Sequence, residues 1–152
     1  DDERLRYSML LAQEAGVDYD IRYAPEAPGD YDYANMARIR IEGHGGTITD
    51  VLGASIGGGN IIITKINETT VSINGKSTTL IIPHRDVPGM IAFVTNVLAA
   101  KGVNIHGFSL SRDRKGGTAV MTIEIDGDTD ASVNDAIMKN PDIISSTILN
   151  AI

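Results

Sequence analysis

Apolar and polar residues alternate in short stretches along the first half of the chain, and this alternation predicts β-strands. Residues 17–23, VDYDIRY, carry an apolar or aromatic residue at every second position, and residues 36–43, MARIRIEG, repeat the pattern. Two further strands are expected near residues 47–55 and 60–66, on either side of a turn at the glycines 57–59.

A helix and a loop complete the prediction for this half. Leu5, Met9 and Ala12 recur at helical spacing, which predicts a helix over residues 3–15 with Asp1 or Asp2 as its cap. Gly16 is expected to end that helix in the left-handed conformation. The proline- and glycine-rich residues 24–35 predict a loop.

The second half predicts the order β-α-β-β-α-β. A strand at residues 78–84 precedes a helix from Pro88 to about Lys101, which Gly102 stops. The buried stripe of this helix is formed by Ile91, Val94, Val97 and Leu98. A strand at residues 103–111, a strand at 118–126, a short helix capped by Thr129 or Asp130, and a last strand at 142–152 follow. We therefore predict an α+β fold in which two helices cover one face of a four-stranded antiparallel sheet, while a partner, another domain or solvent meets the other face.

Composition excludes several classes of function. The 152 residues carry a net charge of −7, and Lys and Arg are scattered, which argues against a nucleic-acid surface. No apolar run reaches transmembrane length, so we expect a cytoplasmic protein with no membrane partner. The absence of cysteine excludes disulfides, a catalytic thiol and thiolate metal sites in this segment. The chain begins with Asp1 rather than Met, and two interpretations stay open: a fragment of a longer protein or a shortened relative.

The triplet His84-Arg85-Asp86 raises the question of catalysis, because kinase catalytic loops also read His-Arg-Asp. The residues that a kinase needs after the triplet are absent, and the chain is too short. A structural interpretation places Asp86 beside a helix N-terminus, where it favours the helix dipole. A functional interpretation adds that the N–H groups around Val87 and Gly89 hold a carboxylate while Asp86 holds an ammonium group, which together describe an amino-acid site.

The glycines 57–59 are the second candidate, because successive N–H groups in such a turn can bind an anion. Ser55 and Asn60 flank the turn and offer side-chain hydrogen bonds; the candidate ligand-binding set is Ser55, Gly57, Gly58, Gly59 and Asn60. A plain tight turn is the simpler interpretation, since neither phosphate-loop nor dinucleotide spacing is present. The three histidines, His44, His84 and His106, lie in separate segments, so we predict no metal site and no catalytic residue.

From residue 77 onward the chain resembles the ACT domain, a small regulatory module that binds amino acids. Asp86, Pro88 and Gly89 at the start of the first helix carry the resemblance, together with the later LAAKGVNI at residues 98–105. The resemblance implies a ligand in the first strand-to-helix loop, with Asn104 and Ile105 at the start of the second strand contributing. It also implies a homodimer formed through this domain.

Upstream, DDERLRYSMLLAQEAGVDYDIRY and ASIGGGNIIITKIN resemble the later part of the beta chain of iron–sulfur-dependent L-serine dehydratases. The resemblance implies residues 1–74 as a partial substrate-binding-like α/β domain, followed by a ferredoxin-like ACT domain at 77–152. It implies conversion of L-serine to pyruvate and ammonia, with a 4Fe-4S cluster held by a partner alpha chain and none bound by this segment. This chain departs from the family in lacking a Ser-Ser-Ser-His-Thr segment and a His-Pro-Asn-Thr-like stretch.

We therefore expect a regulatory and structural role: binding L-serine or a related small amino acid, dimerising, and shaping the catalytic subunit, without catalysis by this segment alone. Two alternatives stay open. The chain could be the serine-sensing tail of a 3-phosphoglycerate dehydrogenase, or a dimerising scaffold with no ligand. The dipeptide Asn74-Gly75 likewise leaves two structures open, a hairpin turn or a hinge between two domains.

Overall fold

A computed structural model of the chain describes residues 3–23, 33–43 and 45–151. The chain divides into two compact units, Asp1–Asp30 and Tyr31–Ile152. In the first unit, the 3-10 helix η1 (Glu3–Tyr7) leads into helix α1 (Ser8–Glu14), and Gly16 adopts the predicted left-handed conformation with φ of 72°. The predicted caps Asp1 and Asp2, most of the predicted loop at 24–35, and His44 lie outside the described residues.

The predicted strand at residues 17–23 is wrong. These residues form no helix or strand, and all seven are exposed. An alternating pattern produces a strand only where a second strand satisfies its N–H and C=O groups, and among the described residues none pairs with this segment. The alternation alone could not reveal that no described strand pairs with this segment.

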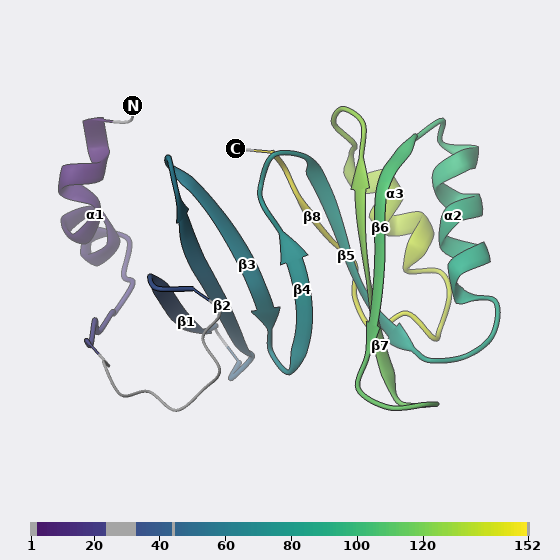
Figure 1. The fold of residues 1–152 in the computed structure, drawn as a ribbon, viewed down its shortest axis with the longest axis horizontal. Coiled ribbons are helices and arrows are strands. Elements are labelled where there is room, and N and C mark those ends of the chain that lie inside the picture. Colours follow the sequence, from purple (N-terminus) through teal and green to yellow (C-terminus); the bar gives the residue numbers. More distant parts are fainter. Residues whose placement is uncertain (1–2, 24–32, 44, 152) are drawn as a thin grey trace. The chain divides into compact units, whose positions relative to one another are not determined.

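The first sheet is an antiparallel meander in the order β1-β2-β3-β4 (Figure 1). Its strands are β1 (Met36–Glu42), β2 (Ile48–Gly57), β3 (Asn60–Ile66) and β4 (Thr69–Ile73), close to the predicted positions. β1 and β2 pair in continuous register from Met36 opposite Ala54 to Glu42 opposite Ile48. The glycine turn at residues 57–59 joins β2 to β3 and confirms the hairpin expected there.

The second sheet confirms the β-α-β-β-α-β order and the α+β class. Its strands are β5 (Thr78–Arg85), β6 (Ile105–Arg112), β7 (Thr118–Ile125) and β8 (Thr147–Leu149), arranged in the order β6-β7-β5-β8. β7 is antiparallel to both β5 and β6, so β5 and β6 run in the same direction. Helices α2 (Met90–Ala100) and α3 (Ala131–Ile137) lie on one face of the sheet (Figure 1).

The details of this half correct several predictions. Ile91 is 47 % exposed rather than buried, and Met90 takes its place in the stripe with Val94 and Leu98. The last strand covers three residues instead of eleven. Asp130, and not Thr129, caps α3 by accepting a hydrogen bond from the N–H of Ser132 at 2.8 Å.

Two apolar clusters cover the two faces of the second sheet. On the helix face, residues such as Leu80, Ile82 and Leu98 are completely buried. On the opposite face, Val71 and Ile73 of β4 pack against Ile81 and Val120. The face that the sequence left open is therefore covered, at least in part, by the first sheet.

The turn at Asn74-Gly75 is resolved in favour of a link between sheets. β4 and β5 belong to different sheets and do not pair with each other, and of the two residues only Gly75 has a positive φ, at 74°. A two-residue hairpin turn of the expected type needs positive φ at both positions. The division into domains 1–74 and 77–152 coincides with this link and stays a prediction.

Candidate functional site

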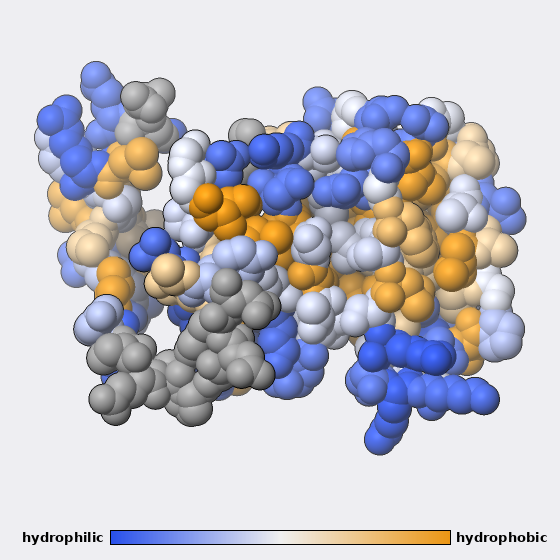
Figure 2. Space-filling view, viewed as in Figure 1, coloured by the Kyte–Doolittle hydropathy of each residue, from blue (hydrophilic) through white to orange (hydrophobic). Residues whose placement is uncertain are grey.

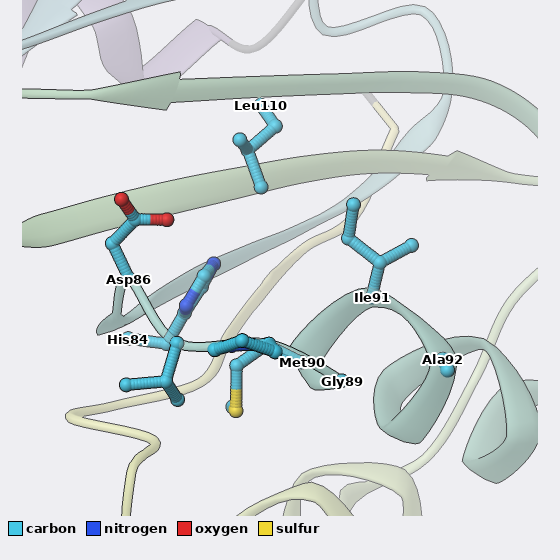
Figure 3. Close-up of a pocket in the computed structure, with 9 residues that line it drawn as sticks. His84, Asp86, Gly89, Met90, Ile91, Ala92 and Leu110 are labelled. Atoms are coloured by element: carbon cyan, nitrogen blue, oxygen red, sulfur yellow. The ribbon is translucent and has the colours of Figure 1, made fainter. Parts of the chain in front are cut away.

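A pocket of about 460 Å³ lies where β5 ends and α2 begins. It is lined by His84, Asp86, Val87, Pro88, Gly89, Met90, Ile91, Ala92 and Leu110. Figure 3 shows the Asp86 carboxylate and the His84 imidazole directed toward the same space, with Leu110 and Ile91 beside it. The structure thus brings together Asp86, Val87 and Gly89, three of the residues predicted from the sequence.

The start of α2 lines this pocket, and its first backbone N–H groups have no partner within the helix. Gly89 is the N-cap residue, no side chain caps the helix, and the first helical bond runs from the N–H of Phe93 to the carbonyl of Gly89. The N–H groups of Gly89, Met90 and Ile91 therefore have no partner within the helix. Val87 differs, since its N–H already donates to the carbonyl of Arg85 at 2.9 Å.

Gly89 is required here by backbone conformation rather than by space. Its φ is 92°, a left-handed value that residues with a Cβ adopt only under strain. A Cβ built at this position would meet nothing within 4 Å. The glycine therefore lets the chain turn sharply into α2 and places no side chain beside the first N–H groups of the helix.

Asp86 is held by the hairpin between β6 and β7. Its Oδ2 accepts hydrogen bonds from Nη1 of Arg112 at 3.1 Å and from the N–H of Gly116 at 3.0 Å. Its own N–H donates to the carbonyl of Gly117 at 2.9 Å. The Gly116 N–H first, and then the Arg112 guanidinium, hold the pKa of the Asp86 carboxyl below its ordinary value, so the group is anionic at neutral pH.

His84 is buried at the base of the pocket with one ring nitrogen unsatisfied. It is only 2 % exposed, and its Nδ1 lies 2.8 Å from the carbonyl of Arg85. Because a carbonyl can only accept, Nδ1 carries the proton in the neutral ring and Nε2 presents a lone pair. Nε2 has no hydrogen-bond partner. Leaving such a group unpaired costs about 1–3 kcal/mol, which a ligand with a suitable donor would recover.

Asn104 and Ile105 lie at the opposite end of the second sheet from Asp86. Ile105 stands opposite Ile125 in β7, and Ile125 stands opposite Thr78, the first residue of β5. The Asn104 side chain donates to Oδ2 of Asp126 at 2.6 Å. Within one chain, Asn104 therefore cannot complete the pocket at the other end of β5.

The residues from Ser55 to Asn60 form the exposed hairpin tip of the first sheet and line no part of the pocket. Gly57, Gly58 and Gly59 have φ values of 87°, 62° and 77°. The amide of Asn60 donates to the carbonyls of Gly57 and Gly58, both at 3.2 Å, and so closes the turn upon itself. This geometry supports the simpler interpretation of the glycines as a tight turn, and their role as a ligand site stays a prediction.

The remaining candidates give no second site. His106 is exposed on β6, and the described residues contain no group of three or more His, Asp or Glu side chains placed to hold a metal ion. Of the helices described, none has the length and apolar character that a membrane crossing needs.

The predicted site set did not include several residues that line the pocket, among them His84, Ile91 and Leu110, nor Arg112, which supports Asp86. A signal for His84 was present, because Leu80, Ile82 and His84 alternate along β5 and so share the buried face. No signal pointed to Arg112, since its contact with Asp86 spans 26 positions and depends on the strand order β6-β7-β5.

A comparison with family models matches residues 78–142 to the ACT domain. The match begins at the first residue of β5 and ends five residues before β8. It therefore contains β5, α2, β6, β7 and α3, and with them every residue that lines the pocket.

Comparison with whole proteins extends the similarity to the first sheet. The chain is 34 % identical over 146 residues to the probable L-serine dehydratase beta chain of Bacillus subtilis, covering 96 % of this chain and 64 % of that protein. It is 28 % identical over 138 residues to the L-serine dehydratase beta chain of Peptoniphilus asaccharolyticus, covering 91 % and 61 %. A D-3-phosphoglycerate dehydrogenase of Mycobacterium leprae is 27 % identical over 130 residues, which are 84 % of this chain but 24 % of that protein. The chain thus spans less than two thirds of the length of these relatives.

Proposed function

Because this chain carries an ACT domain and is related to L-serine dehydratase beta chains over nearly its whole length, we propose that it is the amino-acid-sensing regulatory part of such a dehydratase. Its ligand is L-serine or a closely related small amino acid. The observation that carries the proposal is the uncapped start of α2, which opens beside an anionic Asp86 and an unsatisfied buried His84.

The carboxylate of the ligand is assigned to the start of α2. The N–H groups of Gly89, Met90 and Ile91 have no helical partner, and the positive end of the helix dipole favours an anion there. Gly89 has no side chain to stand between them and the ligand. Val87 lines the wall of the pocket. Its N–H is not assigned to the carboxylate, because it already donates to the carbonyl of Arg85.

The ammonium group and the hydroxyl group have separate partners. Both contacts of Asp86 use Oδ2, so Oδ1 is left to accept from the ligand's ammonium. The lone pair of His84 Nε2 is suited to accept from the serine hydroxyl. A site built to bind a hydroxyl discriminates against an analogue that lacks it, and L-alanine is that analogue.

The position of Asn104, at the end of the second sheet away from Asp86, supports a homodimer. β6 is an edge strand among the described strands, and it carries Phe108 and Leu110, which are 44 % and 39 % exposed. Figure 2 shows apolar side chains gathered over β6 and toward α2. Two copies related by a two-fold axis would pair their β6 strands in antiparallel fashion. Asn104 of the partner subunit would then approach the end of β6 where Arg112 and Asp86 lie.

The catalytic step is assigned elsewhere in the enzyme. The sequence contains no cysteine, so it offers no thiolate for an iron–sulfur cluster, and the described residues offer no alternative metal-binding group. The cluster that the resemblance implies does not fit this chain. We assign it, and the conversion of L-serine to pyruvate and ammonia, to the alpha chain as partner.

The dehydrogenase alternative is less well supported. Identity to the phosphoglycerate dehydrogenase is 27 %, against 34 % for the Bacillus subtilis beta chain. The matched region is 24 % of the dehydrogenase but 64 % of that beta chain. The dehydrogenases still support one element of the proposal, since they too carry a region like this one.

Calorimetric titration with L-serine and L-alanine tests the proposal. We expect L-serine to bind, L-alanine to bind more weakly, and Asp86→Asn to abolish or strongly weaken binding of both. Asparagine keeps an acceptor for Gly116, so the variant removes the charge with little change in shape. Asp50→Asn is the matched control, because Asp50 also pairs with an arginine, Arg38, but on the first sheet. Absence of binding in the wild-type protein, or equal loss in both variants, would contradict the proposed site.

A further inference from the structure

Arg112 bonds Oδ2 of the Asp86 carboxylate, beside the oxygen Oδ1 that the proposed function assigns to the ligand's ammonium group. Its Nη1 lies 3.1 Å from Oδ2 of Asp86, and its side chain is 53 % exposed while that of Asp86 is 20 % exposed. The Asp86 carboxylate is therefore the more buried partner and lies at the pocket. The Arg112 guanidinium is the more exposed partner, and water can hydrate it when the ion pair breaks.

Of the basic residues in the hairpin between β6 and β7, Arg112 is the one that pairs with Asp86. Residues 112–117 read RDRKGG, and Figure 2 shows this tip as a strongly hydrophilic projection below the second sheet. Arg112 contacts Asp86, whereas Lys115 makes no hydrogen bond or ion pair within the part of the chain that the structure describes. The Gly116 N–H and the Gly117 carbonyl hold the backbone of the hairpin against Asp86 independently of the guanidinium.

From this geometry we infer that Arg112 is a built-in competitor for the ammonium subsite, so that an amino-acid ligand binds Asp86 by weakening or displacing the Arg112 ion pair. The inference rests on the proposed function. A single carboxylate is neutralised by one cation, and a second cation at Oδ1 would be repelled by the guanidinium on Oδ2. Binding of the ligand to Asp86 therefore weakens the Arg112–Asp86 ion pair, and the ion pair weakens binding of the ligand by the same free energy.

Removal of Arg112 should change the affinity for the ligand in opposite directions, depending on whether Arg112 competes with the ligand or contacts it. An arginine that held the ligand's carboxylate would lower affinity when removed. An arginine that competes for Asp86 would raise affinity when removed, because the carboxylate is then available without displacement. Asp86 keeps its backbone donor from Gly116 in either case.

Titration of the full chain and its Arg112→Gln variant with two probes separates these possibilities. The probes are L-serine and 3-hydroxypropanoate, which keeps the carboxylate and hydroxyl but has no ammonium group. We expect Arg112→Gln to bind L-serine roughly twofold to fivefold more tightly, the change appropriate to a half-exposed ion pair. Its affinity for 3-hydroxypropanoate should be unchanged or lower, because no competition for Asp86 is involved.

Lys115→Gln is the matched control, since it removes one positive charge from the same hairpin without a contact to Asp86. If Lys115→Gln gained as much affinity for L-serine as Arg112→Gln, the effect would come from net charge and the inference would be overturned. Unchanged or weaker binding of L-serine by Arg112→Gln, with the wild-type protein binding normally, would overturn the inference and leave the proposed function standing. Absence of L-serine binding in all three proteins would overturn both.

Discussion

The two sheets of this chain are built from similar strands but differ in what covers them. In the second sheet, Leu80 and Ile82 are completely buried beneath α2 and α3, and β4 covers part of the opposite face. In the first sheet, Ile39 and Ile41 of β1 are 54 % and 55 % exposed. The strand pairs β1–β2 and β5–β7 both run in continuous register, so hydrogen bonding alone does not distinguish β1 from β5. The difference shows that the pocket stands on a sheet whose helix-facing side is fully packed, whereas β1 gains little from apolar burial.

Substitution of one isoleucine in each sheet should show the largest contrast. Ile82→Ala removes completely buried atoms and is expected to lower the free energy of unfolding by about 2–5 kcal/mol. Ile41→Ala removes atoms that are already half exposed, and should cost at most about 1 kcal/mol, the range of strand propensities. Urea denaturation followed by circular dichroism measures both. Equal losses would mean that β1 is covered as fully as β5.

Two glycine substitutions should give effects of opposite sign. Gly89→Ala forces a Cβ into a left-handed conformation and is expected to destabilise the protein by about 1–2 kcal/mol. Gly43, which follows β1, has no positive φ, and a Cβ there would lie 3.8 Å from the carbonyl oxygen of Thr47. Gly43→Ala should therefore stabilise by about 0.4–1 kcal/mol through the entropy of the unfolded chain. Thermal unfolding of both variants tests the pair, and a Gly89→Ala protein as stable as wild type would refute the assigned strain.

The smallest expected effects come from the two arginine-paired aspartates. The Gly116 N–H and Arg112 lower the pKa of Asp86, and Arg38 lowers the pKa of Asp50, in each case below the ordinary value of 3.8. A lowered folded-state pKa contributes stability above the unfolded value, and this contribution is lost as the pH falls through the folded value. Asp86→Asn and Asp50→Asn should thus each destabilise at neutral pH and lose their effect in strong acid. Unfolding curves at both pH values would contradict this if either variant kept its full effect in acid.

The two halves of the chain also differ in how much of their fold could be predicted from the sequence. The β-α-β-β-α-β order was predictable because each element of the second half has a regular apolar period and a clear end, such as Gly102 after α2. The same alternation failed at residues 17–23, with which none of the described strands pairs. The exposure of Ile91 was not predictable either, since helical spacing identifies a stripe but does not fix its exact centre.

The pocket was predictable only where its residues are neighbours in sequence. Asp86, Val87 and Gly89 lie within four positions, and a strand-to-helix loop brings such residues together in any fold of this order. Leu110 and Arg112 come from β6, and their approach depends on strand order and register. Asn104 was expected in the same site, yet the parallel direction of β5 and β6 places it at the far end. A site completed by a second copy is consistent with both observations.

Amide chemical shifts in a ¹⁵N-labelled chain titrated with L-serine would locate the amino-acid site, because they report on both sheets in one experiment. We expect saturable shifts of the Gly89, Met90 and Ile91 amides at the start of α2. We expect no comparable change at Gly58 and Gly59 in the turn of the first sheet. Shifts confined to that turn, or none at the start of α2, would contradict the assignment of the pocket as an amino-acid site.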